Sequence, residues 1–296
     1  MARIKGLICR FFSLIKALFP VILTAVLCIA VLLAVYLNLH NIFIFTEEHG
    51  LFRDEVKIDQ TENKYPTVSI SQLEKDGRVV FDHSMMLINK DYLLSDTFEA
   101  KISEYKDTGV YMHVSVLEAY ASLSREVTER FDKKLYVSSD FRTAEEQEAL
   151  YREDPLTATV PGASEHQSGL ALDVYVAYYA GDGFIQSPSG RFVNSDCHKY
   201  GFIIRYPSYG EEITGIRFEP WHIRYVGFPH ASVIYNNMLT LEEYILSFEP
   251  GKWYEIEGYL VSRQSVSDSI SLPEDFESCV ISPDNTGYYF VTVKLS

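Results

Sequence analysis

The feature that most constrains this chain is a long apolar segment without charged residues. Ala17 to Phe45 contains no Lys, Arg, Asp or Glu, and Leu18 to Leu39 is almost continuously apolar. A helix needs about 20 such residues to cross a bilayer. We therefore expect a single transmembrane helix at residues 17–39, in a chain whose 296 residues leave room for a domain of catalytic size.

Charges on either side of this segment predict its orientation. Four basic residues precede it: Arg3, Lys5, Arg10 and Lys16. Glu47 and Glu48 follow it. Because Lys and Arg stay on the cytoplasmic side, residues 1–16 are expected to form a cytoplasmic tail, with everything downstream outside the cell membrane. A cleaved signal peptide is the alternative, but its apolar region spans only about 7–15 residues and ends in a small-x-small site. An uncleaved anchor fits better.

Overall composition excludes other classes of protein. The chain is 47% hydrophobic, which is enough to form a packed core, and its net charge is −15. Since four of the basic residues lie before the apolar segment, the remainder is more acidic still and offers no basic stripe for nucleic acid. The four cysteines include no C-x-x-C pair, which excludes a cysteine zinc cluster. Pairing of Cys197 with Cys279 stays open.

Beyond the anchor, the pattern predicts three regions. Residues 40–78, which are polar and charged from residue 46 onward, are expected to be a spacer, residues 79–248 a catalytic-size domain, and residues 249–296 a small all-β appendix. Within the domain, apolar residues recur every three or four positions over 113–131, which predicts a helix. Strands are expected at 134–138, 170–179, 202–206 and 222–226, and in the appendix at 253–261, 278–281 and 288–295. Capping boxes at Thr143 and Thr240 predict two more helices. The expected fold class is α+β, a small antiparallel sheet with flanking helices.

Two short motifs carry candidate chemistry. His166 lies in a loop seven residues before Asp173 on the following strand, and Glu219-Pro220-Trp221-His222 lies later in the chain. Taken singly, each motif is ordinary, since a His–Asp pair is commonly a surface or core hydrogen bond. Together they offer two imidazoles and one carboxylate, a ligand set that binds zinc and leaves a fourth position for water.

The remaining groups needed for hydrolysis are also present. Zinc lowers the pKa of bound water to about 7, and a nearby carboxylate then takes the proton and passes it to a leaving amine. Glu219 is the candidate for this role. Arg142, at a strand-to-helix junction, is the candidate cation for stabilising the oxyanion that develops on an attacked carbonyl; its alternative is a surface salt bridge.

At these residues the chain resembles the VanY-type D-alanyl-D-alanine carboxypeptidases, a branch of the zinc D,D-peptidases that also includes the VanX-type dipeptidases. Four ordered motifs carry the resemblance: S-x-H-x-x-G-x-A-x-D at 164–173, Ser139 to Arg142 with Gln147, Tyr200 to Pro207, and Thr214-Gly215 leading into 219–227. It covers roughly residues 85–248 and, more loosely, the appendix. One departure is Asp140-Phe141 where relatives often carry Gly-Tyr.

The resemblance implies roles for these residues. His166, Asp173 and His222 would bind one zinc ion per chain, Glu219 would act as base and acid, and Arg142 would stabilise the tetrahedral intermediate. Ser164 and Gln147 would help Arg142 to hold the end of the substrate.

The resemblance also implies removal of the last D-Ala from peptidoglycan precursor peptides, contributing to glycopeptide (vancomycin) resistance or cell-wall remodelling. Two alternatives stay open. One is another peptidoglycan peptidase, an L,D-carboxypeptidase or an endopeptidase. The other is a non-catalytic wall-binding module in which the zinc is structural.

Overall fold

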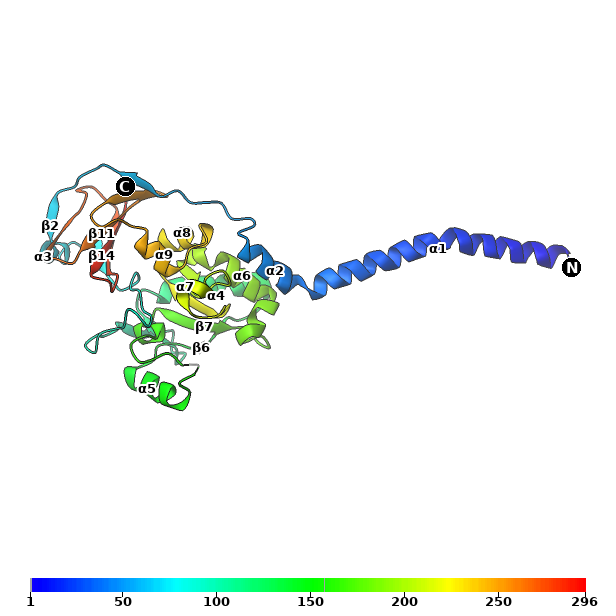
Figure 1. The fold of residues 1–296 in the computed structure, drawn as a ribbon, viewed down its shortest axis with the longest axis horizontal. Coiled ribbons are helices and arrows are strands. Elements are labelled where there is room, and N and C mark those ends of the chain that lie inside the picture. Colours follow the sequence, from blue (N-terminus) through cyan, green and yellow to red (C-terminus); the bar gives the residue numbers. More distant parts are fainter. Residues whose placement is uncertain (1, 157) are drawn as a thin grey trace. The chain divides into compact units, whose positions relative to one another are not determined.

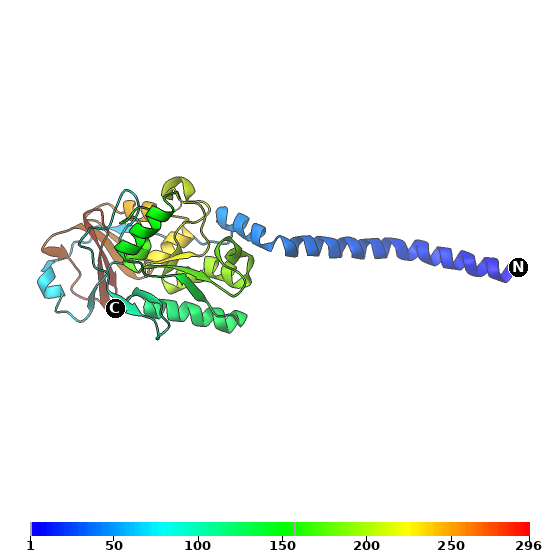
Figure 2. The same ribbon diagram turned by 90° about the horizontal axis from the view of Figure 1, so that it is seen from below.

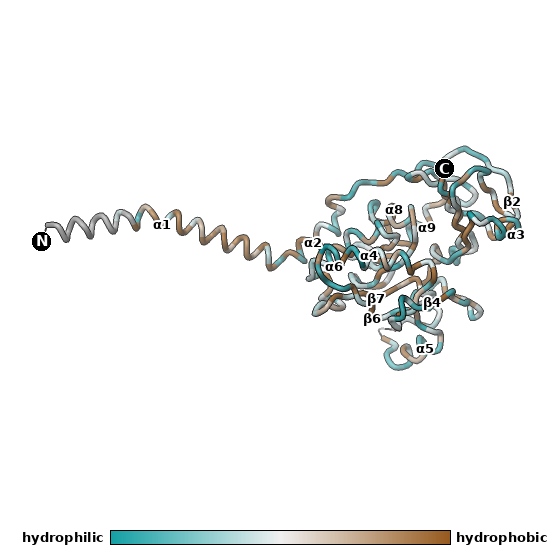
Figure 3. The backbone as a smooth tube through the Cα atoms, turned by 180° about the vertical axis from the view of Figure 1, so that it is seen from behind, coloured by the Kyte–Doolittle hydropathy of each residue, from teal (hydrophilic) through white to brown (hydrophobic). Residues whose placement is uncertain are grey.

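The computed structural model describes residues 2–156 and 158–296. The side chains of residues 1–12 and 14 lie outside the description, which leaves out the expected basic flank at Arg3, Lys5 and Arg10. The chain divides into two compact units, residues 1–45 and 46–296. In the first unit, α1 (Ala2–Leu37) includes an apolar stretch, Ile15–Leu37, long enough to cross a membrane or to serve as a signal sequence. Figure 3 shows this stretch in brown. Helix α2 (Leu39–Glu48) follows α1 in the sequence.

The second unit contains a six-stranded sheet, ordered β1-β10-β11-β14-β13-β3 (Figure 1). Its neighbours are antiparallel except for β13 and β3, which are parallel. The strands are β1 (Asp59–Thr61), β3 (Val79–Phe81), β10 (Trp253–Ile256), β11 (Tyr259–Ser265), β13 (Ser278–Pro283) and β14 (Tyr288–Lys294). The expected single strand at 253–261 is therefore a hairpin, β10–β11. The chain reverses at Glu257-Gly258, where both residues have a positive φ.

Residues 46–78 differ from the spacer expected of them. They supply edge strand β1, strand β2 (Thr67–Ser69), which pairs with β12 (Ser269–Ser271), and helix α3 (Ile70–Leu73). Tyr65 and Leu73 pack with Trp253 in the core on one face of the six-stranded sheet. The sheet expected of residues 249–296 alone thus depends on two strands from earlier in the chain. Three-residue strands held by backbone hydrogen bonds leave little periodicity in a sequence, which is why the polar composition was misleading.

A four-stranded antiparallel sheet, ordered β6-β7-β9-β8, forms the centre of the predicted catalytic region. Its strands are β6 (Tyr136–Ser139), β7 (Ala171–Tyr175), β8 (Phe202–Ile204) and β9 (His222–Tyr225). One face is buried: Leu172, Val174 and Ile223 pack in one core with α4 (Leu117–Phe131) and α6 (Pro188–Asp196). Figure 2 shows α4 running alongside these strands. Because successive side chains of a strand point to opposite faces, Asp173 and His222 lie on the other face.

The remaining elements connect these sheets. Strands β4 (Ile102–Glu104) and β5 (Tyr111–His113) form a hairpin. The other helices are α5 (Ala144–Glu153), η1 (Glu165–Ser168), η2 (Gly181–Gln186), η3 (Cys197–Tyr200), α7 (Glu211–Thr214), α8 (His230–Asn236) and α9 (Leu241–Leu246). The capping boxes at Thr143 and Thr240 are both present, at the starts of α5 and α9. The mixed α+β fold class is confirmed. Cys197 and Cys279 are free and lie in different cores, so they form no disulfide.

Candidate metal centre and active site

Strand register brings the three predicted ligands together. On β7, Asp173 lies directly between Ser139 of β6 and His222 of β9. His166 comes from η1, in the loop that leads into β7. One ligand atom from each of His166, Asp173 and His222 lies within 4.8 Å of the others.

Distances within this triad suit a small tetrahedral cation. His222 Nδ1 lies 3.0 Å from Asp173 Oδ1, and His166 Nε2 lies 3.6 Å from Asp173 Oδ2. Zinc bonds of about 2.1 Å in tetrahedral geometry would separate ligand atoms by about 3.4 Å. Asp173 Oδ1 is buried and has no hydrogen-bond partner among the described residues. The residues present therefore fit a divalent metal ion such as zinc.

His166 is held in one orientation by the backbone. Its Nδ1 lies 2.9 Å from the carbonyl oxygen of Asp140, so an Nδ1–H donates there and leaves Nε2 free as a ligand. The loop turns at Gly169, whose φ is +69°, and a Cβ there would lie 2.8 Å from the backbone nitrogen of His113. Only glycine fits this turn.

The charges around the triad favour a cation. Burial raises the pKa of the Asp173 carboxyl, but the neighbouring imidazoles of His166 and His222 outweigh burial and hold that pKa well below its usual range. Burial also opposes protonation of His222, yet the Asp173 and Glu165 carboxylates raise its pKa to about 9. Both shifts reflect the attraction between the Asp173 carboxylate and the imidazoles beside it.

Glu219 lies next to the triad. Its Oε2 is 3.8 Å from His222 Nδ1, the atom that faces Asp173. Burial raises the pKa of the Glu219 carboxyl above its ordinary value, which suits a group that must take up and release a proton.

Hydrogen bonds hold both terminal nitrogens of the Arg142 guanidinium in place. One terminal nitrogen donates to Gln147 Oε1 at 2.7 Å and the other to Ser139 Oγ at 2.8 Å. Its backbone N–H donates to the carbonyl of His166 at 3.1 Å, which places it beside the loop that carries the ligand.

Gln147, which is predicted to help hold the end of the substrate, makes hydrogen bonds within the protein. It is buried on α5, and its amide nitrogen donates to the carbonyl of Thr159 at 2.7 Å while its oxygen accepts from Arg142. The nitrogen and the oxygen of the side-chain amide thus both make hydrogen bonds within the protein. Ser164 is buried just before η1.

Comparison with known proteins identifies the family. Residues 109–228 match the VanY family, described as D-alanyl-D-alanine carboxypeptidase. A D-alanyl-D-alanine carboxypeptidase of Enterococcus faecium is 30% identical over 278 residues, covering 86% of this chain and 89% of the relative. The chain belongs to the VanY-type D-alanyl-D-alanine carboxypeptidases. The chain is therefore a peptidase.

One further relative and one solved structure are also similar to this chain. The bifunctional D-Ala-D-Ala dipeptidase and D-Ala-D-Ala carboxypeptidase VanXYC of Enterococcus gallinarum is 36% identical over 179 residues, covering 55% of this chain and 93% of the relative. The solved D,D-dipeptidase VanXYg, in complex with a D-Ala-D-Ala phosphinate analogue, shares the fold, with a TM-score of 0.58 at 24% identity over 78% of this chain and 98% of that one.

A cleft of about 580 Å³ lies beside Arg142 in this VanY-type domain. Phe141, Arg142, Gly162 and Gln167 line one part of it. The loop between Leu93 and Ala100 lines another part, and the cleft does not include the triad. It offers room for a peptide next to the fixed guanidinium.

One buried residue at this site is not among the residues that the sequence motifs predict. Glu165, between Ser164 and His166, has a fully buried side chain, and its Oε2 lies 3.7 Å from His222 Nε2. Burial alone would raise the pKa of its carboxyl, but Arg224 and Arg205 hold that pKa far below its usual range, so it is a carboxylate. A signal was present: Arg205 directly follows the apolar strand β8 and Arg224 lies inside strand β9, and a buried arginine requires a buried acid.

Proposed function

We propose that this chain is a membrane-anchored zinc D,D-carboxypeptidase that removes the terminal D-Ala from peptidoglycan precursor peptides ending in D-Ala-D-Ala. The observation that carries this proposal is the position of the Glu219 carboxylate, 3.8 Å from the Nδ1 atom through which His222 joins the His166–Asp173 cluster. A structural metal site needs no such base.

In this proposal His166, Asp173 and His222 hold the zinc ion. Bound zinc supplies a Lewis acid that lowers the pKa of water to about 7. Glu219 accepts a proton from the attacking water as the new C–O bond forms, and donates it to the D-Ala nitrogen as the C–N bond breaks. The products are free D-Ala and a peptide one residue shorter.

Arg142 donates hydrogen bonds to the carbonyl oxygen of the scissile bond, where negative charge develops. We assign Gln147 and Ser139 to positioning this guanidinium, since both accept hydrogen bonds from it. Because these hydrogen bonds already orient the guanidinium, it loses little orientational freedom when the transition state forms. Ser164 is proposed to contact the substrate end.

For the domain organisation, we propose residues 1–16 as a cytoplasmic tail, 17–39 as the anchor and 46–296 as the unit on the outer face. The apolar stretch of α1 and the outward position of peptidoglycan precursors support this topology. We further propose that trimming of precursors contributes to glycopeptide resistance or cell-wall remodelling.

The direct test uses the full chain, purified in detergent and loaded with zinc. It should release D-Ala from a pentapeptide ending in D-Ala-D-Ala and lose this activity with a chelator. Glu219→Gln should lower the rate by about 10² or more at unchanged zinc content, whereas Glu212→Gln, an exposed acid on nearby α7, should not. If mass spectrometry shows that a fragment other than D-Ala is released, the chain is an L,D-carboxypeptidase or an endopeptidase. Full activity of Glu219→Gln would overturn the catalytic role of Glu219.

A further inference from the structure

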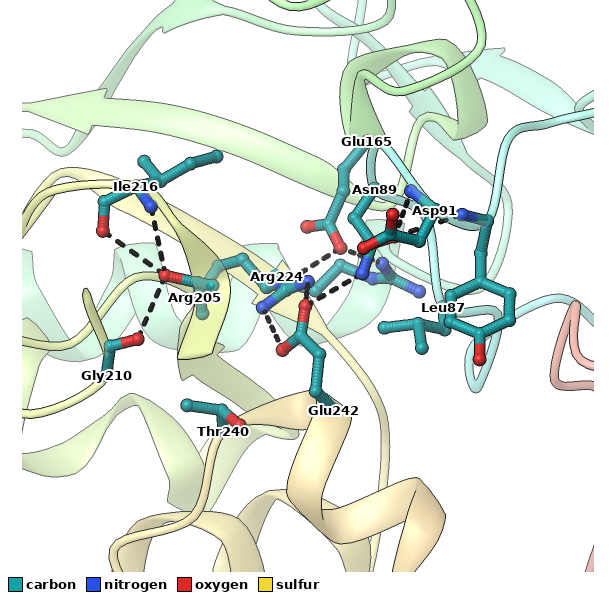
Figure 4. Close-up of polar contacts among 12 residues, drawn as sticks. Leu87, Asn89, Asp91, Glu165, Arg205, Gly210, Ile216, Arg224, Thr240 and Glu242 are labelled. Atoms are coloured by element: carbon teal, nitrogen blue, oxygen red, sulfur yellow. Dashed lines mark hydrogen bonds and ion pairs between the residues drawn. The ribbon is translucent and has the colours of Figure 1, made fainter. Parts of the chain in front are cut away.

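Beside the metal cluster lies a buried network of four charged side chains: Glu165, Arg205, Arg224 and Glu242 (Figure 4). Its charges balance, two positive against two negative. The side chains of Glu165, Arg205 and Arg224 are fully buried, and that of Glu242 is 12% exposed. Burying an unpaired charge is costly, so removing one member leaves an uncompensated charge in the core.

The network holds only one of the two oxygens of Glu165. Oε1 accepts from Arg205 Nε at 2.7 Å and from Arg224 at 2.6 Å. Arg205 also donates hydrogen bonds to both carboxylate oxygens of Glu242, at 2.9 and 2.6 Å. Arg224 also donates to the backbone carbonyls of Ser84 and Met86. The carboxylate of Glu165 is therefore fixed in rotation, with Oε2 turned away from the arginines.

Oε2 of Glu165 and Nε2 of His222 face each other without other partners. They lie 3.7 Å apart, and in the described part of the chain neither makes a hydrogen bond, although both are buried. An N–H···O bond is normally 2.7–3.2 Å long, so an approach of about 0.8 Å would satisfy both atoms. In the neutral ring, which is the form that binds a metal, an Nε2–H on His222 leaves Nδ1 without a proton, and Nδ1 is the atom that faces Asp173 and Glu219.

We propose that Glu165 is a positioning residue: anchored by Arg205 and Arg224, it fixes His222 in the tautomer that binds the metal through Nδ1. His166 has the complementary arrangement, with the Asp140 carbonyl at Nδ1 and Nε2 left for the metal. A carboxylate or carbonyl partner on the second nitrogen of a ligand histidine orients the ring and raises its basicity. This inference rests on the proposed function, because it takes His222 to be a ligand.

Substitution of Glu165 by Gln tests this directly. The arginines only donate, so the amide oxygen of the new side chain must face them, and its NH₂ group must face His222. Nε2 of His222 would then have to accept, which moves the ring proton to Nδ1 and blocks the ligand atom. Zinc affinity of the full chain in detergent, measured by competition with a chromophoric chelator, should fall by about 10- to 100-fold or more.

Glu242→Gln is the matched control. It removes the same charge from the same network and also weakens the hold on Arg205, but Glu242 does not contact His222. It should lower the thermal midpoint while zinc affinity stays within about 3-fold of the parent chain. Equal losses of zinc affinity in both variants would overturn the proposal in favour of a purely structural network.

A second measurement needs no variant. In the zinc-loaded parent chain with ¹⁵N-labelled histidine, NMR should show His222 protonated at Nε2 and bound through Nδ1. Metal bound through Nε2 would contradict the proposal. If His222→Ala keeps its zinc, the proposed function itself fails; if His222→Ala loses zinc while Glu165→Gln keeps full affinity, only the role of Glu165 fails.

Discussion

Replacing Gln147 by Leu distinguishes two roles for this residue: positioning Arg142, or contacting the substrate directly. The substitution roughly keeps the side-chain volume but removes the acceptor for Arg142 and the donor for the Thr159 carbonyl. A hydrogen bond to a charged group contributes about 1.5–3 kcal/mol. If the bond serves to orient Arg142 for the transition state, losing it should lower kcat about 10- to 150-fold, with little change in KM.

The assay is steady-state release of D-Ala from the pentapeptide, with circular dichroism to check that the variant is folded. Gln186→Leu, the same change at an exposed position of η2, should leave both constants unchanged. A Gln147→Leu enzyme with raised KM and normal kcat would refute the positioning role and support direct contact with the substrate, as the sequence resemblance implied.

Two further predictions concern metal and pH. His166→Ala should lose zinc and lower the thermal midpoint, because binding only the folded state stabilises it; unchanged zinc content by elemental analysis would contradict the ligand assignment. His230 is buried between Tyr244 and Thr292, and burial lowers its pKa to about 3. Between pH 6.5 and 3 the unfolded chain therefore takes up a proton that the folded chain does not, and this residue alone should reduce the free energy of unfolding by up to about 1.4 kcal/mol per pH unit. Denaturant titrations followed by the fluorescence of Trp221 and Trp253 should show that the free energy of unfolding depends less steeply on pH in His230→Gln than in the parent chain. The same dependence on pH in both chains would refute this prediction.

Much of the candidate site could be predicted from sequence because its residues lie in or beside regular strands. Asp173 and His222 come from strands whose apolar neighbours, Leu172 and Ile223, mark the buried face. Once these strands pair, alternation places both polar side chains on the opposite face. The positions of Asp173 and His222 in their strands therefore predict that both side chains lie on the same face of the sheet.

Other features depend on contacts that sequence patterns do not encode. Gln147, on α5, follows Arg142 by five residues, but nothing in the sequence distinguishes a side chain that supports Arg142 from one that touches substrate. Glu165 reaches Arg205 and Arg224 across 40 and 59 residues. Edge strand β1 pairs with β10 from the other end of the chain through backbone hydrogen bonds, which any residue type can make.

We propose that three side chains distant in the sequence hold one metal ion beside a catalytic carboxylate. A crystal structure of the zinc-loaded chain with anomalous scattering measured at the zinc edge tests it most directly. We predict a single strong peak about 2.0–2.2 Å from His166 Nε2, an Asp173 oxygen and His222 Nδ1, with Glu219 alongside but not ligating. A peak elsewhere, or one with Glu219 as a ligand in place of any of these three, would contradict it.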